Sequence, residues 1–442
     1  MSRILIAGTH SGCGKTTVTL ALLSVLKTRG LEVSSFKCGP DYIDPMFHRE
    51  IVGVRAHNLD AFFCNETALR DQLVAHAGDI SVLEGVMGYY DGIGPEGHAS
   101  THDVARVTDT PVVLVVDAKG MHASAAAVLR GFRDYKPESH IFGVIFNSIS
   151  PSLYEDYRQI AENAGVPALG FLPCQPELSI GSRHLGLITA GEIADIREKL
   201  TRLGQLAEQH IDIASLLALA GSAVPLEPPA LSQPLLKTVR IAVARDAAFC
   251  FLYQENLELL ELLGAELSFF SPLRDSALPE GIDGLYLPGG YPELHLKMLS
   301  ANAAMRGAIR EAVSGGLPTI AECGGFMYLH KTLDEHPMTG VIPAKAFRTD
   351  RLQRFGYVTL TAAADNLLCR KGESIRAHEF HIYDSTVNGS GFIAAKARNG
   401  AEHICVHATD SLYAGFPHLY FPANPACAEA FIRKAAEYVH RH

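Results

Sequence analysis

The sequence predicts an α/β protein of two domains, because short apolar runs alternate with helix-length stretches in two separate series. The first series places strands at residues 4–7, 82–83, 112–116 and 141–146, and the second at 239–244, 284–287 and 318–321. Such alternation is typical of sheets whose parallel strands are covered by helices on both faces. Each half of the chain is therefore expected to fold around a sheet of its own.

A proline-rich stretch separates the two series. The segment Val224–Pro234 interrupts the strand and helix pattern, and its composition is that of a semi-rigid linker. With 442 residues the chain is also too long for one ordinary domain. We expect one domain at 1–222 and a second at 236–442, joined by a linker at 223–235.

The composition excludes several classes of protein. No apolar run is long enough to cross a bilayer, and we expect a strand rather than a signal peptide at the start of the sequence. The net charge of −10 argues against a nucleic-acid partner. Nine cysteines without Cys-x-x-Cys spacing predict reduced thiols in the cytoplasm. A homodimer is expected only because it is the commonest assembly.

A glycine-rich loop is the strongest functional signal. The sequence GTHSGCGKTT (Gly8–Thr17) follows an apolar strand, and the helix pattern of Thr16–Leu26 follows it. Backbone N–H groups and the positive end of a helix surround phosphates in this context. Lys15 is expected on the outer phosphates and Thr16 on Mg²⁺, although the spacing departs by one residue from the usual pattern. The predicted nucleotide-binding residues of the loop are Thr9, Gly12, Gly14, Lys15, Thr16 and Thr17. The alternative is a plain glycine-rich turn.

Two strand-end residues are expected to complete the nucleotide site. Glu84 ends an apolar strand beside glycines, where a carboxylate is placed to bind Mg²⁺ together with Thr16. Asn147 ends another strand and is positioned to bond a base edge. The alternatives are a solvated acid for Glu84 and a structural turn for Asn147.

The loop KCGPDYID (Lys37–Asp44) follows the second strand and carries a lysine and two acids. Asp41 and Asp44 are expected to bind metal or to position a substrate. Acids in turns also commonly cap the backbone, so this alternative stays open.

The second domain carries a candidate nucleophile. Within Leu317–Leu329 an apolar strand is followed by a sharp turn that carries Cys323 and then by a helix. The thiol is therefore expected to be exposed at the edge of the sheet. The N-terminus of the helix is expected to lower its pKa. The N–H groups of Gly289, Gly290 and Gly324 are the expected oxyanion hole. The alternative is a buried structural cysteine.

A cysteine nucleophile needs a general base from elsewhere in the chain. His418, within FPHLYF (Phe416–Phe421), fits best, and His378 and His381 are its competitors.

With both halves in view, the chain resembles the cobyrinic acid a,c-diamide synthase family over essentially its whole length. The motifs that carry the resemblance are GTHSGCGKTT, FKCGPDYIDP, EGVMGYYDG, SRHLGL and ECGGFMYL. The resemblance implies an ATP-dependent amidoligase domain like dethiobiotin synthetase, followed by a flavodoxin-like class I glutamine amidotransferase domain. It also implies amidation of the a- and c-acetate carboxylates of a corrin acid, with L-glutamine as the nitrogen source.

The resemblance assigns roles to individual residues. It implies ATP and Mg²⁺ at Lys15 and Thr16, with Glu84 as a further metal ligand, and the loop pattern adds Asp44 to the expected metal ligands. It places Asp41, Tyr42, Asp44 and Asp91 around substrate and nucleotide, and it makes Cys323 the nucleophile and His418 its base. His381 is expected on the substrate side.

One position departs from the pattern of related glutaminases. These enzymes usually carry an acid two residues after the histidine, and here that position is Tyr420. What orients His418 is therefore left open.

Several rivals remain. The same motifs also serve amidases acting on hydrogenobyrinic acid or nickel-sirohydrochlorin. A CTP synthase-like ligase and cobyric acid synthase fit less well. A switch of the ParA/MinD kind lacks a cysteine-bearing domain and usually has a lysine where this chain has His10.

Overall fold

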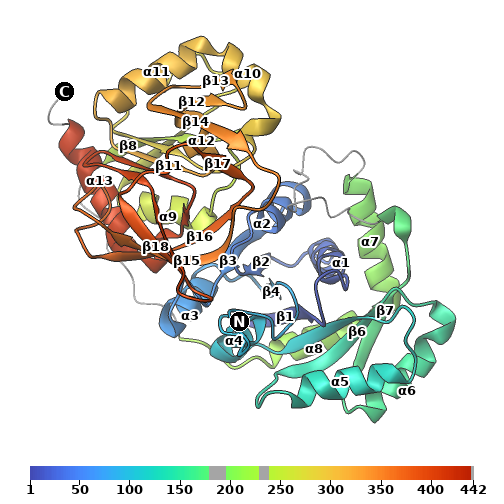
Figure 1. The fold of residues 1–442 in the computed structure, drawn as a ribbon. Helices are drawn as coiled ribbons and strands as arrows, with labels where there is room; N and C mark the ends of the chain where they lie inside the picture. Colours follow the sequence, from blue (N-terminus) through green and yellow to red (C-terminus); the bar gives the residue numbers. More distant parts are fainter. Residues whose placement is uncertain (179–195, 228–237, 440–442) are drawn as a thin grey trace. The chain divides into compact units, whose positions relative to one another are not determined.

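The computed structural model describes residues 1–178, 196–227 and 238–439. The chain divides into two compact units, Met1–Ala230 and Leu231–His442 (Figure 1). Most of the linker expected at 223–235, and the motif SRHLGL at residues 182–187, lie outside the described residues.

The N-terminal unit is built on a parallel sheet of seven strands in the order β3-β2-β4-β1-β5-β6-β7. All of its pairings are parallel, which confirms the predicted parallel sheet. The strands are β1 Ser2–Gly8, β2 Val33–Cys38, β3 Arg55–Leu59, β4 Ile80–Glu84, β5 Val112–Asp117, β6 Ile141–Asn147 and β7 Ala168–Leu172. The four strands expected in this half correspond to β1, β4, β5 and β6.

Helices cover this sheet. They are α1 Lys15–Thr28, α2 Ile43–Phe47, α3 Glu66–Ala75, α4 Thr101–Thr108, α5 Ser124–Asp134, α6 Tyr154–Asn163, α7 Ile196–His210 and α8 Ile213–Gly221. Alternate residues of β1, Ile4 and Ile6, pack in one apolar cluster with α1, α7 and α8. On β6, Phe146 packs against Tyr157 of α6, with ring centroids 4.9 Å apart.

Because the strands are parallel, their carboxyl ends meet at one edge of the sheet. Ile6 and Lys37 are both in register with Glu84, and Asp117 is in register with Asn147. The loop after β1, the loop after β2 and the ends of β4 and β6 therefore gather at this edge.

The C-terminal unit has a central sheet in the order β20-β21-β11-β10-β8-β9, parallel except for β20. Its strands are β8 Val239–Ala244, β9 Ala265–Phe270, β10 Gly284–Leu287, β11 Thr319–Glu322, β20 His407–Ala408 and β21 Leu412–Gly415. Its helices are α9 Gln254–Leu262, α10 Leu296–Ala301, α11 Ala303–Ser314, α12 Gly324–Leu329 and α13 Pro425–Val439. The three strands expected in this half are confirmed as β8, β10 and β11, the last shifted by one residue.

Two further sheets in this unit were not predicted. A five-stranded antiparallel sheet has the order β19-β18-β15-β16-β22, and a four-stranded one the order β13-β12-β14-β17. Their strands are β12 His330–Leu333, β13 His336–Pro337, β14 Ile342–Arg348, β15 Arg354–Ala362, β16 Ser374–His381, β17 Tyr383–Ser385, β18 Phe392–Lys396, β19 Glu402–Cys405 and β22 His418–Leu419. The alternation of apolar and polar residues that would identify β16 as a strand is not evident in the sequence. The buried face of β16 ends in Glu379 and His381 rather than in apolar residues.

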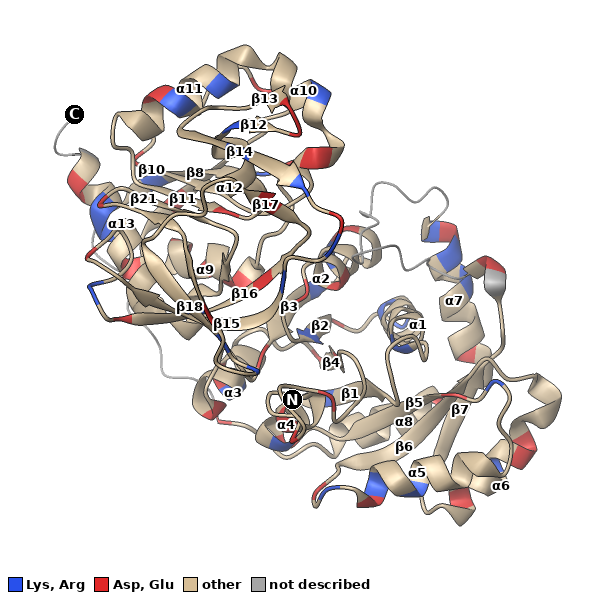
Figure 2. Ribbon diagram, viewed as in Figure 1, with Lys and Arg blue, Asp and Glu red and all other residues tan. Residues whose placement is uncertain are grey.

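Charged side chains gather on the outer helices, as Figure 2 shows along α5, α6 and α11. Several charged side chains are buried instead, and among them Lys37, Glu84 and Glu322 lie at or next to the carboxyl ends of strands. Burying a charge is unfavourable unless it is paired, so these positions point to the sites described below. Among the described residues, no helix combines the length and the apolar character that crossing a membrane requires.

Candidate active sites of the two units

The phosphate-loop geometry of the N-terminal unit depends on two glycines with left-handed backbone. Gly12 has a φ of +85°, and Gly14, which caps the N-terminus of α1, has a φ of +98°. A Cβ on Gly14 would lie 2.0 Å from the Nδ2 atom of Asn147, whereas a Cβ on Gly12 would meet no atom within 4 Å. Asn147 donates from this nitrogen to the carbonyl of Cys13 at 3.1 Å. The strand-end amide therefore holds the loop at its tightest point.

We expect Gly14→Ala to destabilise this unit more than Gly12→Ala. Both changes place a side chain at positive φ, at a cost of about 1–2 kcal/mol. Only the change at Gly14 also displaces Asn147. Gly14→Ala should therefore lose more unfolding free energy and more ATP affinity than Gly12→Ala. Urea unfolding and nucleotide titration of the two variants measure the difference, and equal losses would contradict the packing role of Asn147.

Lys15 folds back over the loop. Its Nζ atom donates to the carbonyls of His10 at 3.1 Å and of Met87 at 2.5 Å. Burial lowers the pKa of Lys15, although Cys13, Glu84 and Asp91 oppose the shift. The side chain thus presents a buried ammonium whose carbonyl partners a phosphate oxygen can replace.

Thr16 and Glu84 lie together, as their strand-end positions predict. The Thr16 hydroxyl donates to Oε1 of Glu84 at 2.7 Å, and Nζ of Lys37 lies 2.8 Å from the same oxygen. Lys37 also pairs with Asp44. Burial opposes the charge on Lys37, but Asp44, Glu84 and Asp41 together outweigh it and hold its pKa well above the ordinary value. The interpretation of Glu84 as a solvated acid is wrong, because its side chain is fully buried.

His48 extends this cluster into the core and was not predicted from the sequence. Its Nε2 atom lies 3.8 Å from Oε2 of Glu84, and its Nδ1 atom is 2.7 Å from the Ser35 hydroxyl. Burial lowers the pKa of His48 to about 4, so the ring is neutral near pH 7. A histidine inside the apolar pattern that follows Lys37–Asp44 is the sequence signal that would have identified it.

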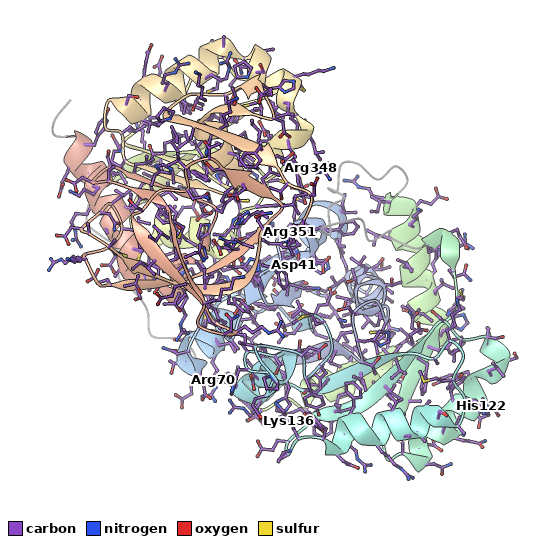
Figure 3. All side chains as sticks on the ribbon, in the orientation of Figure 1. Asp41, Arg70, His122, Lys136, Arg348 and Arg351 are labelled. Atoms are coloured by element: carbon purple, nitrogen blue, oxygen red, sulfur yellow. The ribbon has the colours of Figure 1, made fainter. Side chains whose placement is uncertain are left out.

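Asp41 and Asp91 order their own loops. Oδ1 of Asp41 accepts from the amides of Ile43 at 2.9 Å and Asp44 at 3.2 Å, and Figure 3 labels this residue. Burial, and after it the charge of Asp44, raises the pKa of Asp41 to about 6. Oδ2 of Asp91 accepts from the amide of Gly88 at 2.7 Å. Asp41 and Asp91 therefore both cap backbone amides, which is the alternative left open for the acids of these loops. Asp41 does so next to the Lys37 cluster.

In the C-terminal unit, β11 ends at Glu322, Cys323 forms the turn and α12 begins at Gly324. Cys323 has a φ of +44°, which is a strained conformation for a residue with a side chain. A Cβ on Gly324 would lie 2.8 Å from the amide nitrogen of Gly290, and one on Gly325 would lie 2.1 Å from the carbonyl of Leu287. The glycines let the turn press against the upstream loop, as expected for a nucleophile elbow.

The expected exposure of Cys323 is wrong. The residue is only 6 % exposed, and burial raises its pKa, with Glu293 adding to the rise. A hydrogen bond from the Gly324 amide lowers the pKa but does not offset burial. The helix end therefore acts as predicted, and the apolar surroundings of the thiol outweigh it.

His418 lies beside the same glycine loop. A Cβ on Gly289 would lie 2.4 Å from Cε1 of His418, so only glycine leaves room for the ring. Burial lowers the pKa of His418 to about 3, and His378 and His381 add to this shift. At neutral pH, Cys323 and His418 are therefore a neutral thiol and a neutral imidazole.

Glu322 is the site residue that sequence analysis missed. Its Oε1 atom accepts from the amide of Leu419 at 2.9 Å, and Oε2 accepts from the Tyr286 hydroxyl at 3.0 Å. The Nδ1 atom of His418 lies 3.9 Å from Oε2. An acid that ends an apolar strand, directly before the cysteine, was the available signal.

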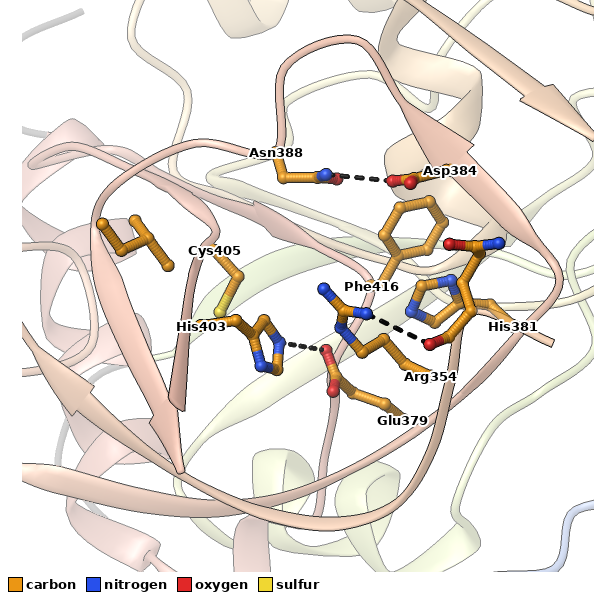
Figure 4. Close-up of a pocket in the computed structure, with 10 residues that line it drawn as sticks. Arg354, Glu379, His381, Asp384, Asn388, His403, Cys405 and Phe416 are labelled. Carbon is orange, nitrogen blue, oxygen red and sulfur yellow. Dashed lines mark hydrogen bonds and ion pairs between the residues drawn. The ribbon is translucent and has the colours of Figure 1, made fainter. Parts of the chain in front are cut away.

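The two competing histidines occupy different faces of the antiparallel sheet. His378 is directly opposite His418 in the pairing of β16 with β22. His381 is on the other face, where its ring stacks on Phe416 with centroids 3.9 Å apart. Figure 4 shows His381 in a pocket with Arg354, Glu379 and His403. The substrate role of His381 stays a prediction.

Two family models match the chain. The model described as CobQ/CobB/MinD/ParA nucleotide binding domain matches residues 4–187, and the model described as CobB/CobQ-like glutamine amidotransferase domain matches residues 240–426. The first contains the phosphate loop and the Lys37 cluster. The second contains Cys323 and His418.

Curated relatives match nearly the whole chain. A cobyrinate a,c-diamide synthase of Thermoplasma volcanium is 40% identical over 99% of this chain and 98% of its own length. Enzymes of the same name from Listeria innocua and Priestia megaterium are 39% and 38% identical, over 96% and 98% of this chain and 98% and 96% of their own lengths. Among solved structures, PurLQS from Thermotoga maritima matches with a TM-score of 0.35 and 18% identity, over 46% of this chain and 99% of that one.

Proposed function

The chain belongs to the cobyrinate a,c-diamide synthase family, and we therefore propose that it uses ATP and L-glutamine to amidate the a- and c-acetate carboxylates of cobyrinic acid during cobalamin synthesis. One observation carries the proposal: a phosphate loop joined to a buried Lys–carboxylate cluster and a cysteine elbow with a histidine occur in one chain. The first suits phosphoryl transfer to a carboxylate, and the second suits release of ammonia from glutamine.

The N-terminal unit would activate the carboxylate. ATP supplies a phosphoryl group that converts a carboxylate oxygen into a leaving group. Lys15, at the start of α1, and Lys37, between Glu84 and Asp44, provide positive charge where the transferred group gains negative charge. The proposed nucleotide contacts come from Thr9, Gly12, Gly14, Lys15, Thr16, Thr17 and Asn147, and the substrate side from Asp41, Tyr42, Asp44 and Asp91.

The residues present also fit a magnesium ion. Mg²⁺ prefers hard oxygen ligands, and the Thr16 hydroxyl and the Glu84 carboxylate lie within hydrogen-bonding distance of each other. Oε2 of Glu84 accepts no hydrogen bond from the described residues, which leaves this oxygen available. Thr16 and Glu84 would hold the ion, with Asp44 beside them, and the ion would neutralise phosphate charge.

The C-terminal unit would release ammonia. His418 takes the thiol proton as Cys323 attacks the glutamine amide carbon, and the same proton then leaves with ammonia as the C–N bond breaks. The amides of Gly289, Gly290 and Gly324 would stabilise the oxyanion, since the Gly289–Gly290 loop packs against Gly324 and His418. Water hydrolyses the remaining thioester to glutamate.

The state of the cysteines bears on the redox environment in which the protein works. All nine cysteines are free, and Cys369 and Cys427 stay unbridged with their sulfurs 3.8 Å apart. This pattern supports a reducing, cytoplasmic location. A homodimer stays a prediction, which light scattering would test.

Mass spectrometry of the reaction products tests the function. With ATP, Mg²⁺, glutamine and cobyrinic acid, we expect two successive replacements of OH by NH₂, with one ADP formed for each amide. Hydrogenobyrinic acid and nickel-sirohydrochlorin serve as alternative acceptors. If only one of these acceptors is amidated, the substrate assignment changes and the chemistry stays the same. If no amidated product forms and glutamine is not hydrolysed either, the proposal is refuted.

A further inference from the structure

We propose that Glu322 is the positioning residue of His418 and takes the part of the acid that related triads carry two residues after the histidine. The inference rests on the proposed glutaminase function of Cys323 and His418. It explains how this chain can have Tyr420 at the usual acid position: the carboxylate comes from the strand before the nucleophile instead.

The contacts of Glu322 connect three strands. Oε1 accepts from the Leu419 amide, next to His418 on β22, and Oε2 accepts from the Tyr286 hydroxyl on β10. The carboxylate itself ends β11, one residue before Cys323. Glu322 therefore fastens the histidine strand to the strand that carries the nucleophile. Both bonds restrain the carboxylate, so its position is set before substrate arrives.

The Glu322 carboxylate also lies beside the imidazole ring of His418. Nδ1 of His418 lies 3.9 Å from Oε2, within ion-pair distance. Catalytic hydrogen bonds are often long before substrate binds. With Nδ1–H directed at Glu322, the lone pair of Nε2 is left for the thiol proton. The opposite tautomer would carry a proton at the atom that must accept one.

Charge gives the second argument. When the thiol proton moves to His418, an imidazolium forms in a site where burial lowers the pKa of that histidine to about 3. A carboxylate at 3.9 Å offsets this cost. Glu322 is 1 % exposed, so water screens the attraction little.

Ionisation of Glu322 gives the arrangement a pH signature. Burial raises its pKa to about 8, although the bonds from Leu419 and Tyr286 oppose the shift. The titratable groups that face it are Tyr286 of β10, Cys323, Tyr413 of β21 and His418 of β22. Because the charged form of Glu322 predominates above its pKa, glutaminase activity should rise with pH through about 8.

The decisive variant is Glu322→Gln. Glutamine keeps the shape and can accept from the Leu419 amide, but its NH₂ group then faces His418 and favours the wrong tautomer. We expect the glutaminase kcat to fall at least about 100-fold with KM for glutamine changed less than about threefold. Ammonia-dependent amidation in the same preparation should stay unchanged, and the rise in activity near pH 8 should disappear. An unchanged kcat, or a pH profile like that of the wild type, would overturn the proposal.

Two further variants protect this test. Asp283→Asn makes the same change at another acid of this unit that accepts from a backbone amide, that of Arg240 at 2.7 Å. Asp283 precedes β10, at the edge of the sheet opposite the Cys323 turn, so this variant should keep glutaminase activity within about threefold. If Glu322→Gln also loses ammonia-dependent amidation, Glu322→Asp distinguishes positioning from a structural role. The charge that aspartate retains should restore glutaminase activity and its pH dependence. If it does not, the role of Glu322 is structural and the proposal is overturned. Absence of glutaminase activity in the wild type would instead refute the proposed function.

Discussion

Lys15→Ala should abolish amidation with glutamine and with ammonium alike. Both nitrogen sources need an activated carboxylate, and Lys15 is the loop ammonium that would stabilise the phosphoryl group during its transfer. We expect the rate to fall by about 1,000-fold or more with either donor. Steady-state ADP release, measured in parallel with each donor, provides the readout. Glutamine hydrolysis by the C-terminal unit should remain measurable.

Lys27→Ala is the matched control. Lys27 lies in the last turn of the same helix and donates to the carbonyl of Val52, away from the loop. Its removal should lower stability by about 1 kcal/mol and leave amidation unchanged. If Lys15→Ala amidates as well as Lys27→Ala, the phosphate role of the loop is refuted.

Cys323→Ala should separate the two activities of the enzyme. Without the thiol no thioester forms, so glutamine-dependent amidation and glutaminase activity should fall at least about 1,000-fold. Amidation with a high concentration of ammonium should persist, because the N-terminal unit retains every residue of its own site. Product formation with each donor measures the separation.

Cys369→Ala controls for the loss of a buried thiol. Cys369 is 6 % exposed, as Cys323 is, and lies in the same unit without the strained turn. Its removal should leave activity with both donors within about twofold and cost about 1 kcal/mol of stability. Loss of both activities in Cys323→Ala, with normal stability, would refute the division of labour between the units.

The α/β architecture and the two chemical signals were predictable from the sequence. A strand, a glycine loop and a helix occupy consecutive residues at Gly8–Thr17, and a strand, a turn and a helix surround Cys323. The pairing of Thr16 with Glu84 was also predictable, although the two are 68 positions apart, because parallel strands bring their carboxyl ends to one edge.

Other features depended on tertiary contacts. The antiparallel sheet of β15, β16, β18, β19 and β22 was missed because polar residues of β16 face inward at its end. The exposure and pKa of Cys323 were predicted wrongly, since burial outweighs the helix end, and no local pattern reports burial.

The fold class and the residue types of both sites can be predicted from the amino-acid sequence, because their motifs are runs of neighbouring residues whose backbone conformation is local. Which side chains face each other across the C-terminal site depends on how the strands of that unit pack together. Glu322 reaches Leu419 across 97 positions, through strands whose order the sequence does not specify. A side-chain contact of this kind depends on strand order and register, and both are set by the packing of the whole unit.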